Sequence, residues 1–394
     1  MQIKKIYQLK GKIQHYAWGG YDFIPGLLGA DNNEHVPCAE YWMGIHPLAP
    51  SVIIDDSNEI LLSEKAAPDS ISFLLKILDV REMLSIQVHP SKAAAEKGFD
   101  EEEKRGIPLN ASSRNYKDRN DKPEMMLALS EFWLLHGFKT EDKTEHILNS
   151  YNAFTDLLPF FKEGSYRSLF QHIMNLPQEE VNTKLLPLVK EEMQKKTMGL
   201  ITREDAGWWV CKLFEGRDLP ADLDRGIFSL YLLNIVHLHP GEAIFQGAGL
   251  IHAYLEGQNL ELMTNSDNVL RGGLTPKHID VHELLLNTKF EATIPSLIQK
   301  KEMGHCEYSY PVPVDSFALN RIELAAGGLY ISSSASPEIW FCMNGHAEFY
   351  AGNSIEIRKG ASAFIPAETD FSVHAAEACT LYRVSVPVQK NNSL

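Results

Sequence analysis

The hydrophobic pattern changes its period twice along the chain, and these changes limit the folds that the chain can adopt. Up to about residue 135, short apolar runs such as FLLKILDV, MLSIQVHP and FWLLHGF are separated by Gly, Pro, Asn and Asp. Runs of this kind are typical of β-strands joined by turns. From about residue 141 to residue 224 the apolar residues recur at three-and-four spacing, as at Val181, Leu185, Leu188 and Val189. This spacing predicts amphipathic helices.

A strand pattern returns after the helical segment and continues to the end of the chain. It begins in SLYLLNIVHLHPGEAIFQ, residues 229–246, and resumes in HAYLEGQNLELM. Beyond about residue 300, turn sequences occur at Asn344-Gly345, Gly352-Asn353 and Gly360, at intervals typical of a sandwich or barrel. The polar segment SKAAAEKGFDEEEKRGIPLNASSRNYKDRN, which begins at Ser91, has helix formers at its start and loop residues at its end, and is expected to form a surface excursion between two strands.

The sequence therefore predicts a mainly β protein with an α-helical insertion. We expect the β domain that holds the site to be discontinuous, with its first part at residues 1–140 and its second part at residues 226–300. Between them lies an inserted helical domain at residues 141–225, and a separate C-terminal jelly roll follows at residues 301–394.

The charge balance excludes several classes of partner. The 394 residues contain 37 Lys and Arg against 52 Asp and Glu, a net charge of −15. Such a field repels nucleic acid and anionic membrane surfaces, so we expect neither as a partner. An anionic small molecule would need a local pocket of Lys and Arg. The five cysteines form no C-x-x-C pair and the first residues contain no apolar leader, from which we expect a cytoplasmic protein with reduced thiols.

Four residues offer metal ligands in three separate segments. In QVHP, Gln87 and His89 stand at i and i+2 of an expected strand and so share one face. Glu124 follows Lys-Pro at the start of the run EMMLAL, and His252 follows the glycine-rich sequence GAGLI. Each residue also has an ordinary structural explanation, such as a satisfied core histidine or a solvated turn glutamate.

By spacing alone, a pair of histidines elsewhere in the chain fits a metal site better than Gln87 and His89 do. His237 and His239 lie two residues apart on an expected strand, and Glu242 adds a carboxylate after Pro-Gly. Such a group could hold iron or zinc, but Pro-Gly also suggests a surface hairpin turn. This cluster is therefore an alternative site. His15, His35, His46, His136 and His278 have no partner at ligand spacing and are expected to be structural or surface residues.

The segment ELMTNSDNVLRGGLTPK concentrates charge among turn-forming residues. Its Glu261, Asp267, Arg271 and Lys277 suggest a loop for anion binding and proton transfer, although a polar connection would have a similar composition. No P-loop, G-x-G-x-x-G, G-x-S-x-G or H-E-x-x-H motif occurs. Nucleotide-dependent and serine-nucleophile chemistry is thereby disfavoured.

Taken together, these segments resemble the type I mannose-6-phosphate isomerases (phosphomannose isomerases), which are zinc enzymes of the cupin superfamily. The similarity runs through QHYAWGG, AEYWMGIHP, LLKILDVREMLSIQVHPSK, NYKDRNDKPEMMLAL and HAYLEGQNLELMTNSDNVLRGGLTPKHIDV. It implies cupin-type β jelly rolls with an inserted helical domain. It also implies interconversion of mannose 6-phosphate and fructose 6-phosphate through an enediol.

The resemblance implies a role for individual residues. The expected ligands of one Zn²⁺ per chain are Gln87, His89, Glu124 and His252. The expected catalytic residues are Arg271, Glu261, Asp267 and Lys122, without a choice of base. The residues expected to bind the substrate are Lys277, Lys76, Ser85, Lys92 and Trp18. The expected partner is a small-molecule sugar phosphate, and the chain is expected to be a monomer or a weak homo-oligomer.

Two other functions are compatible with parts of the sequence. An iron-dependent cupin oxygenase would use His237, His239 and Glu242, and metal identity would distinguish it from the isomerase. A non-catalytic sugar-phosphate-binding cupin would keep the pocket without turnover. The presence of Arg271 and Glu124 argues against that second alternative.

Overall fold

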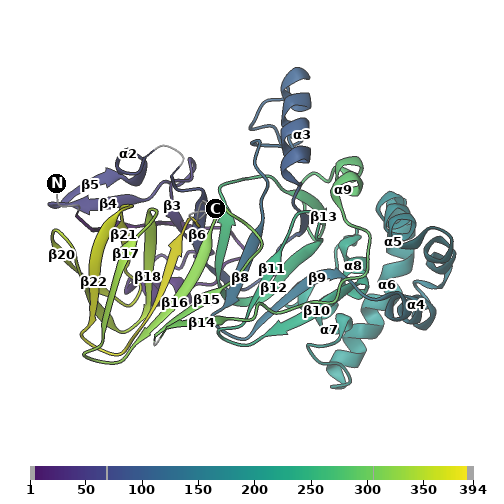
Figure 1. Cartoon of the computed structure of the whole chain (residues 1–394). Helices are drawn as coiled ribbons and strands as arrows, with labels where there is room; N and C mark the ends of the chain where they lie inside the picture. Colours follow the sequence, from purple (N-terminus) through teal and green to yellow (C-terminus); the bar gives the residue numbers. More distant parts are fainter. Residues whose placement is uncertain (1–4, 68–69, 305, 388–394) are drawn as a thin grey trace.

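Strands form in the segments where short apolar runs predict them. In the computed structural model, which describes residues 5–67, 70–304 and 306–387, these runs become β6 (Phe73–Val80), β7 (Ile86–Val88), β8 (Glu124–Ala128) and β9 (Phe132–Phe138). The prediction of a mainly β fold with a helical insertion is confirmed. Figure 1 shows the helices of residues 141–232 grouped at one end of the molecule and the C-terminal strands at the other. None of the helices in the described ranges is long and apolar enough to cross a membrane.

The central sheet has ten strands, and β12 (His252–Thr264) belongs to both of its layers. The first half of β12 pairs with β9 and β7, whereas its second half pairs with β6 and β8. The other strands of this sheet are β2 (Lys12–Gln14), β3 (Glu40–Gly44), β10 (Leu233–Leu238), β11 (Ala243–Gln246) and β13 (Leu270–Gly273).

Strand β12 changes layers at Gly257. The register shifts between Tyr254 and Glu256, and Gly257 has a φ of 129°. A Cβ atom there would lie 2.6 Å from the carbonyl oxygen of Glu131, so only glycine fits. At this bend the pairing partners of β12 change from β7 and β9 to β6 and β8. As a result His252, before the bend, reaches Glu124, whose strand pairs with the half of β12 after the bend.

The predicted helical insertion is confirmed. Its elements are α4 (Glu141–Ser150), the short 3-10 helix η1 (Thr155–Leu157), α5 (Leu158–Asn175), α6 (Gln178–Thr197), α7 (Ala206–Leu213) and α8 (Gly226–Leu232). The expectation of strand at residues 229–232 is wrong, because these residues form the end of α8 and β10 begins only at Leu233. All seven residues of α8 are buried, so this helix has no polar face from which its period could be recognised.

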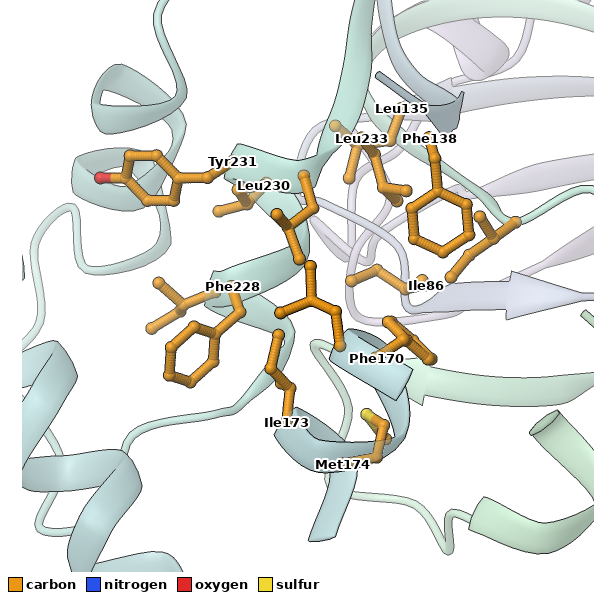
Figure 2. Packing of buried hydrophobic residues seen from close by; sticks show 14 of the residues in the cluster. Ile86, Leu135, Phe138, Phe170, Ile173, Met174, Phe228, Leu230, Tyr231 and Leu233 are labelled. Atoms are coloured by element: carbon orange, nitrogen blue, oxygen red, sulfur yellow. The ribbon is translucent and has the colours of Figure 1, made fainter. Parts of the chain in front are cut away.

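The helices pack on the outer face of the strands that carry the expected ligands. Figure 2 shows Phe170 and Ile173 of α5, Phe228 of α8 and Ile86 of β7, which belong to one buried hydrophobic cluster. Ile86 and Val88 are fully buried in this cluster, while Gln87 between them points to the opposite face of the strand. The helical insertion therefore holds β7 through the face that carries Ile86 and Val88, and Gln87 on the opposite face can point to the site.

The C-terminal sandwich takes three of its strands from the start of the chain. Its nine-stranded sheet has β1 (Tyr7–Lys10), β4 (Val52–Asp55) and β5 (Asn58–Leu61) beside C-terminal strands, and β1 pairs directly with β21. Strand pairing thus crosses the expected boundary between residues 300 and 301. The four domain ranges remain predictions about folding units, and part of the last range, residues 305 and 388–394, lies outside the described residues.

The remaining elements complete the two sandwiches and their connections. The C-terminal strands of the nine-stranded sheet are β14 (Lys301–Gly304), β15 (Glu307–Tyr310), β16 (Ala318–Leu324), β18 (Glu338–Asn344), β21 (Ser362–Ile365) and β23 (Cys379–Ser385). The facing sheet contains β17 (Leu329–Ser334), β19 (His346–Tyr350), β20 (Ser354–Arg358) and β22 (Thr369–Ala375). The helices outside the insertion are α1 (Phe23–Leu28), α2 (Leu62–Lys65), α3 (Lys92–Lys104) and α9 (Val281–Asn287). The expected surface excursion after β7 is α3 and the loop that follows it.

Candidate metal centre and active-site cavity

Three of the four expected metal ligands meet in the interior of the central sandwich. His89 follows β7, Glu124 begins β8 and His252 begins β12. The Nε2 atoms of His89 and His252 lie 3.2 Å and 3.3 Å from the two carboxylate oxygens of Glu124. All three side chains are buried, and their ligand atoms lie within 4.8 Å of one another.

The second ring nitrogen of each histidine is already bonded to the backbone. His89 Nδ1 lies 2.8 Å from the carbonyl oxygen of Asn268, and His252 Nδ1 lies 2.9 Å from that of Leu250. Because a carbonyl only accepts, each Nδ1 carries a proton, and Nε2 is the nitrogen of each ring that is available to a metal ion. Both Nε2 atoms and Glu124 Oε2 lack a hydrogen-bond partner among the described residues. A metal ion would satisfy all three of these buried atoms.

The protonation states favour a cation at this position. Burial lowers the pKa of His89 to about 4, so its imidazole is neutral near pH 7. Burial alone would raise the pKa of Glu124, but Lys122 and His89 outweigh it and hold that pKa well below the usual range. Lys122 Nζ lies 3.0 Å from Glu124 Oε1. Two imidazole nitrogens and one carboxylate form a donor set suited to Zn²⁺.

Gln87 occupies the position expected of a fourth ligand. On one side β7 pairs with β12, with Gln87 opposite His252, and on the other side it pairs with β13, with Gln87 opposite Arg271. The Gln87 side chain lines the cavity next to the three buried ligands. Its coordination of a metal remains a prediction.

A cavity of about 690 Å³ opens beside the three ligands. Its lining includes eight of the expected site residues, namely Trp18, Lys76, Ser85, Gln87, Lys122, Asp267, Arg271 and Lys277. Lys92 does not line this cavity. Its amine, at the start of α3, instead donates to the carbonyl oxygen of Arg119 and to Asn120 Oδ1. A role for Lys92 in binding phosphate thus has no support from its position.

Lys76 is held by two carboxylates. Its Nζ lies 3.0 Å from Glu261 Oε1 and 3.4 Å from Glu40 Oε2, and it lies 4.9 Å from the centre of the Trp42 ring. Burial would lower the pKa of Lys76, but these carboxylates raise it above its ordinary value. Burial raises the pKa of Glu261 despite the ion pair. This buried network fixes the wall of the cavity, and little of the charge on Lys76 is left for a substrate.

Glu40 and Trp42 belong to the site but are not among the residues that the sequence singled out. They lie at i and i+2 of β3 and contact each other through a hydrogen bond of 2.5 Å from Trp42 Nε1 to Glu40 Oε2. Strand alternation in EYWMG predicts that these two side chains share a face. The same pattern that selected Gln87 and His89 could therefore have found them.

The polar part of the cavity lining also contains Asp267, His46 and two basic residues. Asp267 Oδ1 lies 3.3 Å from His46 Nε2, and despite burial this contact lowers the pKa of Asp267. His46, expected to be structural or at the surface, is buried and lines the cavity. Among the described residues, the side chains of Arg271 and Lys277 have no hydrogen bond or ion pair. Burial lowers the pKa of both, and Arg271 adds to the effect on Lys277.

The alternative histidine cluster forms with a different carboxylate. His237 and His239 come together with Glu131, not with Glu242. The carboxylate of Glu242 instead accepts a hydrogen bond of 2.8 Å from the backbone N–H of His239. The expectation that Glu242 completes this cluster is wrong, because Pro240 and Gly241 turn the chain so that Glu242 caps its own hairpin.

Comparison with known proteins gives a consistent result. The family described as "Phosphomannose isomerase type I, catalytic domain" matches residues 6–141. Mannose-6-phosphate isomerases of Shigella flexneri and Escherichia coli are each 36% identical over 382 residues, covering 91% of this chain and 94% of theirs. A crystal structure of mannose 6-phosphate isomerase from Salmonella typhimurium, bound to its substrate fructose 6-phosphate and to zinc, has a TM-score of 0.84 at 33% identity. That comparison covers 97% of this chain and 100% of the other.

Proposed function

The chain belongs to the family of type I phosphomannose isomerases, and from this premise we propose that it interconverts mannose 6-phosphate and fructose 6-phosphate with the help of Zn²⁺. The observation that carries the proposal is the set of three buried donor atoms without hydrogen-bond partners, next to a cavity with unpaired basic side chains. The relatives are named for this reaction, and one of them was solved with both zinc and fructose 6-phosphate.

His89, Glu124 and His252 would hold the zinc ion, with Gln87 as the fourth protein ligand. When bound, zinc acts as a Lewis acid that polarises the substrate oxygens and stabilises an enediolate. Lys122 keeps the Glu124 carboxylate ionised, and the carbonyl groups of Asn268 and Leu250 orient the two imidazoles. These contacts prepare the ligands before metal binding, as partners of ligands do in other metal sites.

Arg271 and Lys277 are the residues best suited to an anionic substrate. Both line the cavity, and neither side chain has an acidic partner among the described residues. A guanidinium can donate to two oxygen atoms at once, whereas a lysine offers a mobile point charge. We assign Arg271 to the reacting oxygens or the phosphate, and Lys277 and Ser85 to the phosphate. Trp18, which stacks on Tyr16 with ring centres 5.9 Å apart, forms part of the cavity wall.

For the proton transfer between C2 and C1 we favour Asp267 over Glu261. Asp267 lines the cavity and its pKa is lowered, so it is ionised and can accept a proton. Glu261 is buried behind Lys76 and does not line the cavity. Its carboxylate holds Lys76 in place. Lys122 lines the cavity and could return a proton to an oxygen atom of the enediol.

The proposal extends to the setting in which the protein works. All five cysteines are free, which agrees with a reducing, cytoplasmic location. The net charge of −15 disfavours nucleic acid and anionic membranes as partners. We keep the expectation of a monomer or a weak homo-oligomer.

A coupled assay tests the proposed function. The purified protein should convert each of the two hexose phosphates into the other, lose turnover after chelation and regain it when Zn²⁺ is added. Asp267→Asn should abolish incorporation of solvent deuterium at C1 and C2, while Glu261→Gln should retain measurable incorporation. Absence of turnover in the zinc-loaded protein would refute the function. The reverse pattern in the two variants would refute only the choice of base.

A further inference from the structure

A second group of metal-ligating side chains lies outside the cavity. Glu131 stands in the turn between β8 and β9, and His237 and His239 stand at the end of β10. The antiparallel pairing of β10 with β9 brings these segments together, with His237 opposite Trp133. One ligand atom from each of Glu131, His237 and His239 lies within 4.8 Å of the other two.

The orientation of these side chains is fixed by packing. The ring of His237 stacks on buried Trp133 with the ring centres 4.1 Å apart and the planes 4° apart. The rings of His237 and His239 meet edge to face at 4.7 Å. The hydrogen bond from the His239 backbone to Glu242 fixes the hairpin that carries His239. Such support keeps the two imidazoles in place without a bound ion.

One carboxylate faces both imidazoles. Glu131 Oε2 lies 2.5 Å from His237 Nε2 and 3.0 Å from His239 Nδ1. His239 Nδ1 forms a hydrogen bond with this carboxylate. His237 Nε2 is shielded from solvent, but its contact lacks the alignment of a hydrogen bond, and it has no other partner in the part of the chain that the structure describes. A simple ion pair therefore satisfies His239 but leaves the shielded Nε2 of His237 near the same oxygen without a hydrogen bond.

We propose that Glu131, His237 and His239 form a second metal site, specific for a divalent transition-metal ion such as Zn²⁺ or Cu²⁺. Two imidazole nitrogens and one carboxylate are the borderline donors that these ions prefer over Mg²⁺ or Ca²⁺. The side chains of Glu131, His237 and His239 are 54%, 31% and 63% exposed, so solvent can complete the coordination and the ion can exchange. The site is independent of the proposed isomerase function.

Counting bound metal tests the proposal. Untagged protein that already holds its tightly bound zinc would be dialysed against increasing free Zn²⁺, and the bound metal would be counted. The wild-type chain should bind a further equivalent, whereas His237→Ala/His239→Ala should lose it. His374→Ala, which removes an exposed histidine from the C-terminal sandwich, should keep it. Isomerase activity should be unchanged in all three proteins, because none of these residues lines the cavity.

Two further measurements distinguish a metal site from an ion pair. Glu131→Gln keeps the size of the side chain but removes the charge, and it should weaken the additional binding. With Cu²⁺, the difference between the electron paramagnetic resonance spectra of the wild-type and double-variant proteins should show coupling to two imidazole nitrogens. If the wild-type and double-variant chains bind the same amount of metal, the cluster is an ion pair only and the proposal is overturned.

Discussion

Individual side chains decide whether the buried centre binds metal. Glu124 contacts both imidazoles. We therefore expect the wild-type protein to keep its zinc during dialysis, whereas Glu124→Ala and His252→Ala should each lose both the zinc and the turnover. Glu124→Ala should also unfold more easily, because it leaves the buried Lys122 amine without its carboxylate, at a cost of about 3 kcal/mol or more. Metal analysis and denaturant unfolding test both effects. Retention of tight zinc in both variants would place the catalytic metal elsewhere.

Arg271→Lys should keep the fold and the zinc but impair turnover. If Arg271 contacts the reacting oxygens, kcat should fall by about 10² to 10³, as when an oxyanion donor is removed, and KM should change little. If Arg271 only anchors the phosphate, KM should rise and kcat should be largely spared. Steady-state kinetics on the zinc-loaded variant distinguishes these outcomes. Near-normal values of both constants would remove Arg271 from the site.

Buried His136 should make the metal-free protein sensitive to acid. Burial lowers its pKa to about 4, whereas in the unfolded chain the value is about 6.5. Between these values the unfolded chain binds more protons than the folded protein, so stability falls as the pH decreases from about 6.5 to about 4. Each such histidine contributes a slope of up to about 1.4 kcal/mol per pH unit.

Unfolding of the chelated protein by urea at several pH values measures this slope. His136→Gln should reduce it by about one proton, while His374→Ala should leave it unchanged because His374 is exposed. An equal slope in the His136 variant would show that other groups cause the acid sensitivity.

The sequence anticipated the residues of the site better than their interactions. The i, i+2 spacing singled out Gln87 of β7 and His89, which directly follows this strand, and three of the four expected ligands converge. The ion pair between Lys76 and Glu261 joins residues 185 positions apart and became visible only through the register of β6 and β12. Short motifs do not encode such pairings, so Lys76 was expected to contact the phosphate rather than a carboxylate.

At the level of elements, the bend in β12 is the feature on which the site depends. Gly257→Ala would combine an unfavourable φ with a contact of 2.6 Å to the backbone of Glu131, and should cost about 2 kcal/mol or more. The variant should also bind zinc more weakly, because the bend brings His252 to Glu124. Gly26→Ala is a matched control, since a Cβ atom there meets no neighbour within 4 Å. Thermal unfolding and zinc titration of both variants test this role.

Sequence periodicity predicted the strands of the central sheet, but it could not predict that one strand serves two layers. The run from His252 to Thr264 is long and mostly buried, and nothing in its alternation distinguishes a straight strand from a bent one. For α8, uniform burial concealed the helical period in the same way. The hydrophobic period of a sequence shows which side of a helix or strand faces solvent. Where both sides are buried, the pattern has no period, and the type of element cannot be recognised from it.

For the molecule as a whole, the C-terminal sandwich and the N-terminal strands β1, β4 and β5 share one nine-stranded sheet, and we expect them to fold together. A fragment of residues 301–394 lacks β1, which lies between β21 and β4, and should not fold by itself. Calorimetry of the complete chain should show the C-terminal sandwich unfolding together with the N-terminal strands. Circular dichroism and proteolysis of the isolated fragment give the complementary test, and a stable, protease-resistant fragment would contradict the assignment.

The pairing of Tyr7 with Phe364 also orders events during synthesis. Strand β1 (Tyr7–Lys10) leaves the ribosome long before its partner β21 (Ser362–Ile365), so one edge of β1 must wait while the strands between them are made. Until then the growing polypeptide carries an unprotected strand edge, which chaperones or neighbouring nascent chains can engage. The synthesis of β21 thus determines when the edge of β1 is protected from aggregation.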